Sequence, residues 1–372
     1  DVWLCSGQSN MQWVVNNVTN AEVEKKNANY SQIRTLNIPR RMELSPKDTI
    51  STTWLVCSPE TVGRFSGVAY FFARKVYEET NIPIGIINSS WGGTIVETWT
   101  SLEAANTLPQ KRLDRYNKNE KLSPPTEYFT RTNKEAKRND YPSLVYNAMI
   151  HPLLSFAIKG VVWYQGENNV GNAEPYTDWL TCMISDWRNR WNSELPFYII
   201  QLPNFDSTNK TPLWAEIRDA QRKVLTVPKT HLIVTSDLGD PHDLHPRNKQ
   251  EVGMRVALQV LHHEYGRPDI VSESPMFERM EINGDKIIIT FKNTGSGLEI
   301  RSRYGCLQGF TIAGEDKKFY WAQGELKDNR IVIWNPKVPN PIAVRYNWEN
   351  NPDGNLYNKD GLPACLFRTD NW

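Results

Sequence analysis

Most of the chain alternates short apolar runs of strand length with longer amphipathic segments of helix length. The apolar runs are the opening stretch from Val2, then Ile33–Ile38, Ile82–Asn88, Val161–Tyr164, Phe197–Leu202 and His231–Thr235. The amphipathic segments are Ala21–Asn29, Val68–Thr80, Leu144–Ile158, Asn172–Trp191, Leu213–Thr226 and Lys249–Tyr265. This alternation indicates parallel strands joined by helical crossovers. We therefore predict that residues 1–271 form an α/β domain, with a mainly parallel sheet between two helical layers.

The pattern changes from about Ser272, where short alternating runs are separated by Asn-Gly, Gly-Ser-Gly and Pro-Asn-Pro turns. The runs are Lys286–Phe291, Phe319–Gln323, Arg330–Trp334 and Ala343–Trp348. Alternation of this kind is typical of antiparallel strands with one buried face. We predict a second domain over residues 272–372 that is all β and sandwich-like.

The charge and cysteine content exclude several classes of protein. The 372 residues carry 43 basic and 42 acidic side chains, a net charge of +1, without a long basic cluster. Nucleic acids and anionic membranes are therefore poor candidate partners, and no apolar run is long enough to span a bilayer. The five cysteines have no CxxC spacing, so we predict neither a disulfide framework nor a zinc site, and no cofactor.

The first apolar run ends in Gly7-Gln8-Ser9-Asn10-Met11, just before a predicted helix from Ser9 to Val15. A serine at a strand-to-helix turn is well placed as a nucleophile, because helix N-terminal N–H groups can stabilise an oxyanion. The alternative is that Ser9 only caps the helix. Met11 replaces the second glycine of the G-x-S-x-G elbow, so the α/β-hydrolase fold is excluded.

Three further predicted strands end in residues that suit catalysis. Gly92-Gly93 could donate backbone N–H groups or form a simple turn, and Gln165 to Asn169 offers side-chain amides. The last strand is followed by Asp237 to Pro246, which contains Asp243 and His245. Because parallel strands end at the same edge of a sheet, these segments can converge there.

A serine nucleophile needs a base and an acid, and this last segment supplies candidates for both. In an extended segment, residues two apart face the same side, so the Asp243 carboxylate could accept a hydrogen bond from the His245 ring. Asp240 and Glu167 remain alternatives for the acid. His151, which precedes a proline, is more consistent with a structural role.

Together these motifs resemble the SGNH (GDSL-like) hydrolases, and more closely their sialate O-acetylesterase group. The resemblance rests on Gly7 to Met11, Trp91-Gly92-Gly93-Thr94 with Glu97 and Trp99, Trp163 to Glu167, and Asp243 to Pro246. It implies Ser9 as nucleophile and His245 as base. It also implies an oxyanion hole formed by the N–H of Ser9, an N–H of Gly92 or Gly93, and a side-chain amide of Gln165 or Asn168. Two positions depart from the common pattern: His242 stands where an aspartate usually precedes the histidine by three, and Asn169 replaces an acid.

The resemblance implies an esterase that removes O-acetyl groups from carbohydrates, with acetylated sialic acid as the leading substrate and acetylated xylan or another glycan as the alternative. A carbohydrate-binding protein without turnover is a second hypothesis, and a lipid esterase a third. The resemblance also implies export and a β domain ahead of the opening strand. Since the sequence opens at Asp1, directly before a strand, we expect a processed or truncated chain.

Residues 101–142 are polar, rich in lysine and without clear periodicity. Such a long excursion at the predicted active-site edge is either a loop that covers the substrate or a surface insertion.

Overall fold

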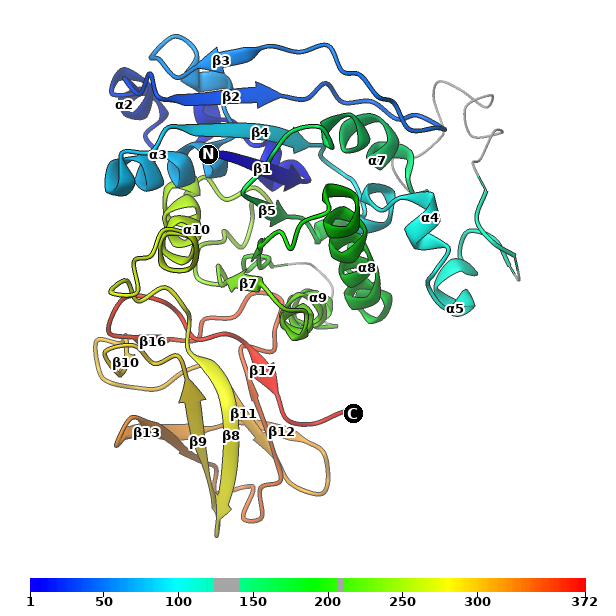
Figure 1. Cartoon of the computed structure of the whole chain (residues 1–372). Helices are drawn as coiled ribbons and strands as arrows, with labels where there is room; N and C mark the ends of the chain where they lie inside the picture. Colours follow the sequence, from blue (N-terminus) through cyan, green and yellow to red (C-terminus); the bar gives the residue numbers. More distant parts are fainter. Residues whose placement is uncertain (119, 124–140, 207–210) are drawn as a thin grey trace. The chain divides into compact units, whose positions relative to one another are not determined.

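The computed structural model describes residues 1–118, 120–123, 141–206 and 211–372 (Figure 1). Internal contacts divide the chain into two compact units, each assembled from three segments. The first unit comprises Asp1–Ile200, Ala220–Leu232 and Arg247–Leu261, and the second comprises Gln201–Asp219, Ile233–Pro246 and His262–Trp372. The boundary between residues 271 and 272 lies within the last of these segments and stays a prediction.

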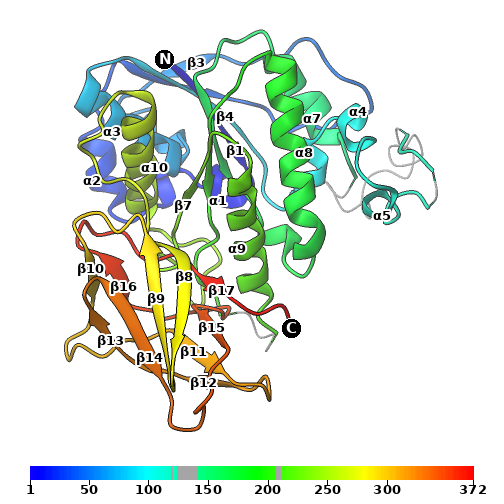
Figure 2. The ribbon, with the colours of Figure 1, turned by 60° about the horizontal axis from the view of Figure 1, so that its bottom comes forward.

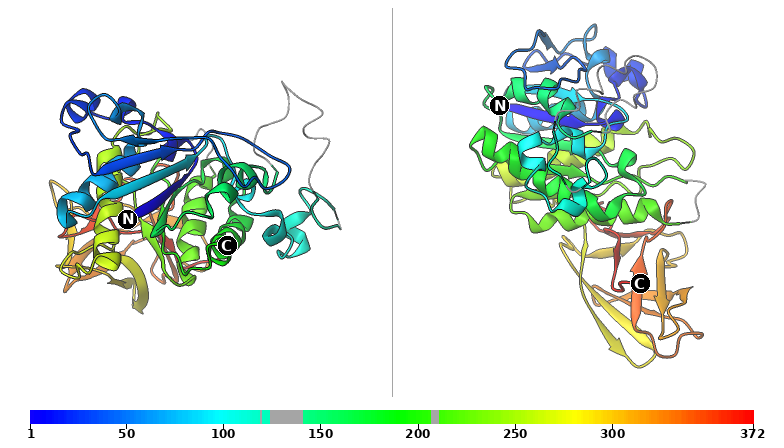
Figure 3. Two further views of the ribbon diagram at one scale, coloured as in Figure 1. Left: turned by 45° about the horizontal axis from the view of Figure 1, so that its top comes forward. Right: turned by 90° about the vertical axis from the view of Figure 1, so that its right-hand side faces the viewer.

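A seven-stranded sheet with the order β3-β2-β4-β1-β5-β6-β7 forms the centre of the first unit. Its strands are β1 (Val2–Gly7), β2 (Ile33–Asn37), β3 (Trp54–Val56), β4 (Ile84–Ser90), β5 (Gly160–Tyr164), β6 (Phe197–Ile200) and β7 (Thr230–Ile233). β1 is central and pairs in parallel with both β4 and β5. The left view of Figure 3 shows β1, β2 and β4 side by side in blue and cyan. The antiparallel edge strand β3 was not predicted.

Helices cover both faces of this sheet, as predicted. Figure 2 shows α3 and α10 on one face and α7 and α8 on the other. The helices are α1 (Ser9–Gln12), α2 (Ala21–Lys26), α3 (Gly67–Thr80), α4 (Leu102–Ala105), α5 (Gln110–Leu113), α7 (Leu144–Met149), α8 (Ala173–Trp191), α9 (Leu213–Lys223) and α10 (Lys249–Glu264). The Ser66 hydroxyl caps α3 by accepting a hydrogen bond from the Ala69 N–H at 3.3 Å.

The opening helix is shorter than the sequence suggests. It was expected to run from Ser9 to Val15, but α1 ends at Gln12. Val14 instead forms an isolated antiparallel bridge with Ser66 at the start of α3. The chain after the turn at Ser9 therefore pairs with another element before it enters the short 3₁₀-helix Val15–Asn17.

The second unit contains antiparallel sheets, which confirms the predicted all-β C-terminal region. Two four-stranded sheets have the orders β13-β14-β9-β8 and β12-β11-β15-β17, and β10 pairs with β16. The strands are β8 (Met276–Asn283), β9 (Lys286–Lys292), β10 (Leu298–Ile300), β11 (Phe310–Ala313), β12 (Phe319–Trp321), β13 (Gln323–Lys327), β14 (Arg330–Trp334), β15 (Ala343–Tyr346), β16 (Leu356–Asn358) and β17 (Phe367–Arg368).

The core of this unit lies between the inward faces of the two larger sheets. Ile287 and Ile289 of β9 pack in one cluster with Ile312 of β11 and Val344 of β15. Their neighbours along β9 are more exposed, as a half-buried strand requires. The single strand predicted from Phe319 to Gln323 is wrong, because the chain breaks at Ala322 and continues in the other sheet as β13.

No helix in the described part of the chain is long and apolar enough to cross a membrane. All five cysteines are free thiols. Of the excursion over residues 101–142, the described part contains α4 and α5. Residues 119 and 124–140 of the expected covering loop lie outside the described residues.

Candidate active site

Ser9 lies at the turn where β1 ends and α1 begins, and this turn requires Gly7. Gly7 has a φ of 137°, and an added Cβ would lie 2.1 Å from the carbonyl oxygen of Tyr164 in the neighbouring β5. The same oxygen accepts a hydrogen bond from the Gln8 N–H at 3.0 Å. The absence of a side chain at Gly7 therefore lets the chain turn tightly against β5 and leaves Ser9 partly exposed.

The N–H of Ser9 is available to an oxyanion. Ser9 is the first residue of α1, where N–H groups have no partner within the helix, and its N–H makes no hydrogen bond to any described residue. Because α1 has a single turn, the field of a long helix contributes little here. At this position the local N–H group, and not a helix dipole, can stabilise an oxyanion.

Gly92 and Gly93 follow β4, and Gly92 lies beside Ser9. A Cβ added to Gly92 would lie 3.2 Å from the Cβ of Ser9. However, the Gly92 N–H already donates to Oε1 of Gln12 at 2.8 Å. Gly93 has a φ of 76° and open space where a Cβ would lie, and its N–H makes no hydrogen bond to a residue in the described ranges. Of the two glycines, Gly93 is the better oxyanion donor.

The two candidate amides in the third segment differ in their surroundings. Asn168 is exposed, and its Nδ2 donates to the Gly93 carbonyl at 2.9 Å, which leaves the second hydrogen of this amide for a substrate. Gln165 is fully buried, and its Nε2 lies within 3.1 Å of acceptors on Gln8, Thr94 and Asn169. These contacts favour Asn168 as the oxyanion donor and a structural role for Gln165.

Gln8 holds the segment from Gln165 to Asn169 against the turn at Ser9. Its buried Oε1 accepts hydrogen bonds from Gln165 Nε2 at 3.1 Å and from the N–H groups of Gly166 and Asn168, both at 3.3 Å. Sequence reasoning placed Gln8 in the motif but gave it no role. One carbonyl oxygen thus sets the position of Asn168 relative to Ser9.

Two buried charged side chains contact Asn10, the residue after Ser9. Asn10 Nδ2 donates to Oε1 of Glu167 at 2.5 Å, and Asn10 Oδ1 accepts from the fully buried ammonium of Lys249 at 2.5 Å. Burial raises the pKa of the Glu167 carboxyl, while the Asn10 hydrogen bond and the Lys249 charge oppose this rise. The sequence did not predict the contact between Asn10 and Lys249, because 239 positions separate the two residues.

A second buried carboxylate supports the same segment from the other side. Glu97 Oε2 accepts from Asn169 Nδ2 at 2.9 Å, and Asn169 Oδ1 accepts from the Val96 N–H at 3.0 Å. Burial raises the pKa of the Glu97 carboxyl above its ordinary value. The Asn169 that replaces the expected acid therefore links the second and third segments of the motif.

The predicted acid and base lie in a loop of the second unit. The segment from Asp243 to His245 is bent and not extended as expected, and it follows a turn in which the Asp243 N–H donates to the Asp240 carbonyl at 3.4 Å. Asp243 Oδ1 accepts from the backbone N–H of His245 at 2.8 Å. Asp240 Oδ1 binds the N–H of His242 in the same way. Asp243 therefore braces the backbone at His245, which is partly buried.

Neighbouring segments of the second unit hold this loop in place. The Gly239 N–H donates to Asn204 Oδ1 at 2.7 Å, and the Asp206 N–H donates to the Pro241 carbonyl at 3.1 Å. The Tyr357 hydroxyl donates to Asp237 Oδ2 at 3.2 Å. The structure thus brings Ser9, Gly92, Gly93, Gln165 and Asn168 together in the first unit, while Asp240, Asp243 and His245 belong to the second.

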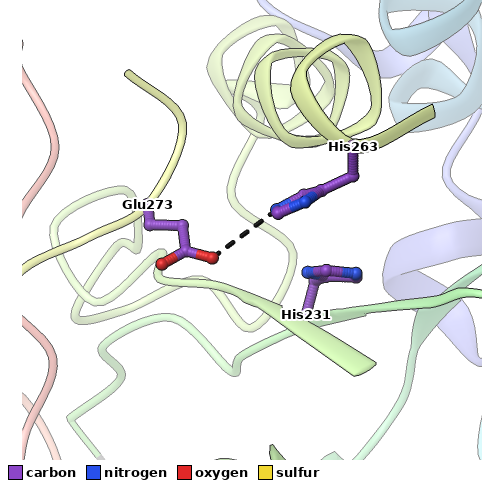
Figure 4. A group of neighbouring side chains, drawn as sticks. All are labelled: His231, His263 and Glu273. Carbon is purple, nitrogen blue, oxygen red and sulfur yellow. Dashed lines mark ion pairs between the residues drawn. The ribbon is translucent and has the colours of Figure 1, made fainter. Parts of the chain in front are cut away.

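Outside these segments, Figure 4 shows His263 and Glu273 of the second unit as an ion pair, with Nε2 and Oε1 3.5 Å apart. His231 of the first unit stacks on the ring of Tyr198 with the centroids 4.8 Å apart. These contacts account for each side chain without a ligand, and we assign no metal site to them.

Comparison with known proteins identifies relatives among the carbohydrate esterases. A family model described as carbohydrate esterase, sialic acid-specific acetylesterase, matches residues 1–262. Sialate O-acetylesterases from Pongo abelii and Homo sapiens are 33% and 32% identical in alignments of 318 residues that cover 77% of this chain. The chain spans 57% of the length of each of these two relatives. The mouse sialate O-acetylesterase is 29% identical over 95% of this chain and 73% of its own length.

One solved structure is similar over the whole chain. It is a carbohydrate acetylesterase from Xanthomonas citri, with a TM-score of 0.88 and 37% sequence identity. The similarity covers 100% of this chain and 81% of that protein. The predicted resemblance to the sialate O-acetylesterase group is thereby confirmed.

Proposed function

This chain belongs to the sialic acid-specific acetylesterase family of carbohydrate esterases, and on that premise we propose that it is a serine esterase that removes O-acetyl groups from carbohydrates. The observation that carries the proposal is the arrangement around Ser9. A partly exposed serine with an available N–H lies against Gly92, and Asn168 is bonded to the adjacent Gly93. This arrangement offers a nucleophile together with donors for an oxyanion.

In the proposed mechanism, Ser9 Oγ attacks the acetyl carbonyl carbon while His245 takes the hydroxyl proton. The carbonyl oxygen becomes an oxyanion, for which the N–H groups of Ser9 and Gly93 and the Nδ2 of Asn168 are the donors. Collapse breaks the ester bond, and the protonated His245 gives its proton to the leaving sugar oxygen. Water then attacks the acetyl-serine with His245 as base, and acetate leaves as Ser9 recovers its proton.

We assign the acid of the triad to Asp243. Its carboxylate already lies at His245, where Oδ1 binds the backbone N–H, and Oδ2 remains to orient the imidazole. The charge also favours the imidazolium that forms during acyl transfer. Glu167 is the weaker candidate, because its Oε1 is already bound by the Asn10 amide, which also accepts from the Lys249 ammonium.

For the substrate, we propose O-acetylated sialic acid first and another acetylated glycan, such as acetylated xylan, second. The curated relatives are named sialate O-acetylesterases, whereas the structurally similar protein is named a carbohydrate acetylesterase. Acetate release from a panel of defined acetylated sugars separates the two. The proposal includes action outside the cytoplasm, as the family resemblance implies, and cell fractionation tests it.

The first prediction concerns the nucleophile. Ser9→Ala removes one oxygen from a partly exposed position, so the fold should remain while kcat for p-nitrophenyl acetate falls about 10^4-fold or more. An organophosphonate should label the parent protein but not Ser9→Ala, and it should still label Ser31→Ala, the control that changes an exposed serine outside the proposed site. Substantial turnover by Ser9→Ala would refute the serine mechanism. Absence of hydrolysis by the parent on every acetyl ester would favour a carbohydrate-binding protein without turnover.

A further inference from the structure

The second unit contains an aromatic hollow that the proposed acyl transfer does not use. The hollow has a volume of about 160 Å³ and lies beside the sheet formed by β12, β11, β15 and β17. Phe319, Trp321 and Trp348 supply its rings, and Thr311, Glu349 and Asp353 supply polar atoms. Phe319 and Trp321 are two apart in β12 and so present their rings on the same face.

Trp321 is unusual for a side chain of its size, because 57% of its surface is exposed. Its backbone carbonyl accepts a hydrogen bond from Asn335 Nδ2 at 2.7 Å, which holds the strand while the ring faces solvent. A large exposed ring at the edge of a hollow loses hydrophobic stabilisation unless something covers it.

The other two rings are held in place by arginines. The Arg345 guanidinium lies 3.9 Å from the centroid of Phe319, and the Arg368 guanidinium lies 5.0 Å from that of Trp348. Arg345 is itself fixed by two hydrogen bonds to the Asp370 carboxylate, of 2.8 and 2.6 Å. The aromatic walls are therefore ordered without a ligand, which lowers the entropic cost of binding one.

The polar wall is equally well anchored. The buried guanidinium of Arg218 donates to the carbonyl oxygens of Glu349 and Asn350. Asn350 Oδ1 accepts from the Trp214 N–H at 3.0 Å, and Asn351 Oδ1 accepts from the side-chain amide of Asn204 at 2.7 Å. These bonds fix the loop whose exposed carboxylates border the hollow.

We propose that this hollow binds one neutral pyranose ring of a glycan. The apolar C–H face of a sugar ring packs well on an exposed indole, and the carboxylates of Glu349 and Asp353 accept hydrogen bonds from sugar hydroxyls. The same two charges disfavour a carboxylated sugar, and the Arg345 charge is already paired with Asp370. The volume is below the roughly 300–1,000 Å³ of a typical ligand pocket, which suits a single ring with the rest of the glycan in solvent.

The proposal is independent of the esterase assignment, since none of the residues that line the hollow belongs to the proposed triad or oxyanion hole. Saturation-transfer NMR and calorimetric titration of the full chain with methyl β-glucoside, β-galactoside and β-xyloside test it. We expect at least one neutral glycoside to bind with a Kd of about 1 mM and the methyl glycoside of sialic acid to bind more weakly. Trp321→Ala should weaken binding of the neutral glycoside about tenfold or more, whereas Tyr304→Ala, which removes a 79% exposed ring elsewhere in the unit, should not.

A second pair of variants keeps the aromatic surface. Glu349→Gln and Asp353→Asn should weaken neutral-sugar binding and reduce the preference against the sialic acid glycoside. Hydrolysis of p-nitrophenyl acetate should be unchanged in Trp321→Ala, and sugar binding unchanged in Ser9→Ala, so the two proposals fail separately. The proposal is overturned if no neutral pyranoside binds, if Trp321→Ala binds as tightly as the parent, or if the sialic acid glycoside binds most tightly.

Discussion

Asn168 and Gln165 are two amides in one loop with opposite surroundings, and this difference decides what each can do. Asn168 is exposed and donates one amide hydrogen to the Gly93 carbonyl, whereas the Gln165 amide is buried among three acceptors. The spacing of the motif favoured Asn168 as the oxyanion donor and kept Gln165 as the alternative. The hydrogen-bond partners point the same way, because they leave one amide hydrogen of Asn168 available and bury the amide of Gln165 in the loop.

The second prediction follows from this contrast. Asn168→Ala should lower kcat by about 10^2 to 10^3 with little change in stability, the usual effect of deleting one oxyanion donor. Gln165→Ala should instead lower the free energy of unfolding by about 1–3 kcal/mol, because buried acceptors lose their donor. Kinetics and urea unfolding of both variants measure the difference. If Asn168→Ala keeps the parent kcat, the oxyanion hole consists of backbone groups alone.

The third prediction concerns the acid of the triad. Asp243→Asn should keep the hydrogen bond to the His245 N–H but favour the wrong imidazole tautomer, a change that costs about 10^4 in kcat in a well-studied serine protease. Asp240→Asn and Glu167→Gln are matched controls, since each keeps its hydrogen-bond acceptor and loses its charge. The assignment to Asp243 is wrong if kcat of Asp243→Asn falls by less than about tenfold while kcat of one of the controls falls by about 10^4.

At the scale of elements, the sequence predicted those with a strong local signal. β5 and α8 were found within a residue or two, because an unbroken apolar run and a long amphipathic helix each identify themselves. The three-residue β3 and the short strands β10, β16 and β17 were missed because their stability comes from pairing with distant partners. The bend from Asp243 to His245, where an extended segment was expected, was missed for a related reason, since a side chain that binds a nearby N–H group defines it.

The candidate site shows the same limit. Ser9, Gly93, Asn168 and His245 were predicted because motifs at strand ends mark them. The contacts behind Ser9 were not predicted, because Lys249 reaches Asn10 across 239 positions and no local pattern reports that contact. Candidate catalytic residue types leave a signal in the sequence, while buried groups that contact them are visible only in three dimensions.

The fourth prediction tests the junction of β1 and α1. Gly7→Ala adds a methyl group 2.1 Å from the Tyr164 carbonyl oxygen at a φ of 137°, so β1 and β5 must separate or the turn must rebuild. We expect a loss of more than about 3 kcal/mol in stability, or a fall in kcat from a displaced Ser9. Gly284→Ala is the control, because its φ is 60° but its surroundings are open, and it should cost about 1–2 kcal/mol. Equal effects of the two changes would contradict the close approach of β1 and β5.

At the scale of the whole molecule, the two units are interleaved along the chain. The segments Gln201–Asp219 and Ile233–Pro246 lie between stretches of the first unit along the sequence. By their contacts, however, they belong to the second unit. The loop with His245 is one of them. The composition change near Ser272 marks where the β-rich sequence begins, but it does not report these contacts, because the two segments resemble the α/β pattern around them.

The last prediction tests whether residues 1–271 can act alone. A fragment with these residues keeps every group of the proposed triad and oxyanion hole, but it loses partners of the two interleaved segments. Arg218 would lose the carbonyl oxygens of Glu349 and Asn350, and a guanidinium buried in the intact chain would be left without these acceptors. Asp237 would lose the Tyr357 hydroxyl at the start of the His245 loop. We therefore expect the fragment to unfold at lower urea concentration than the full chain and to lose most of its hydrolysis of p-nitrophenyl acetate.

Tyr357→Phe in the full chain is the control, because it removes only the hydroxyl. Its free energy of unfolding should stay within about 1 kcal/mol of the parent value, since a single hydrogen bond is lost. A fragment with the parent kcat and a cooperative urea transition would show instead that residues 1–271 are an autonomous esterase domain.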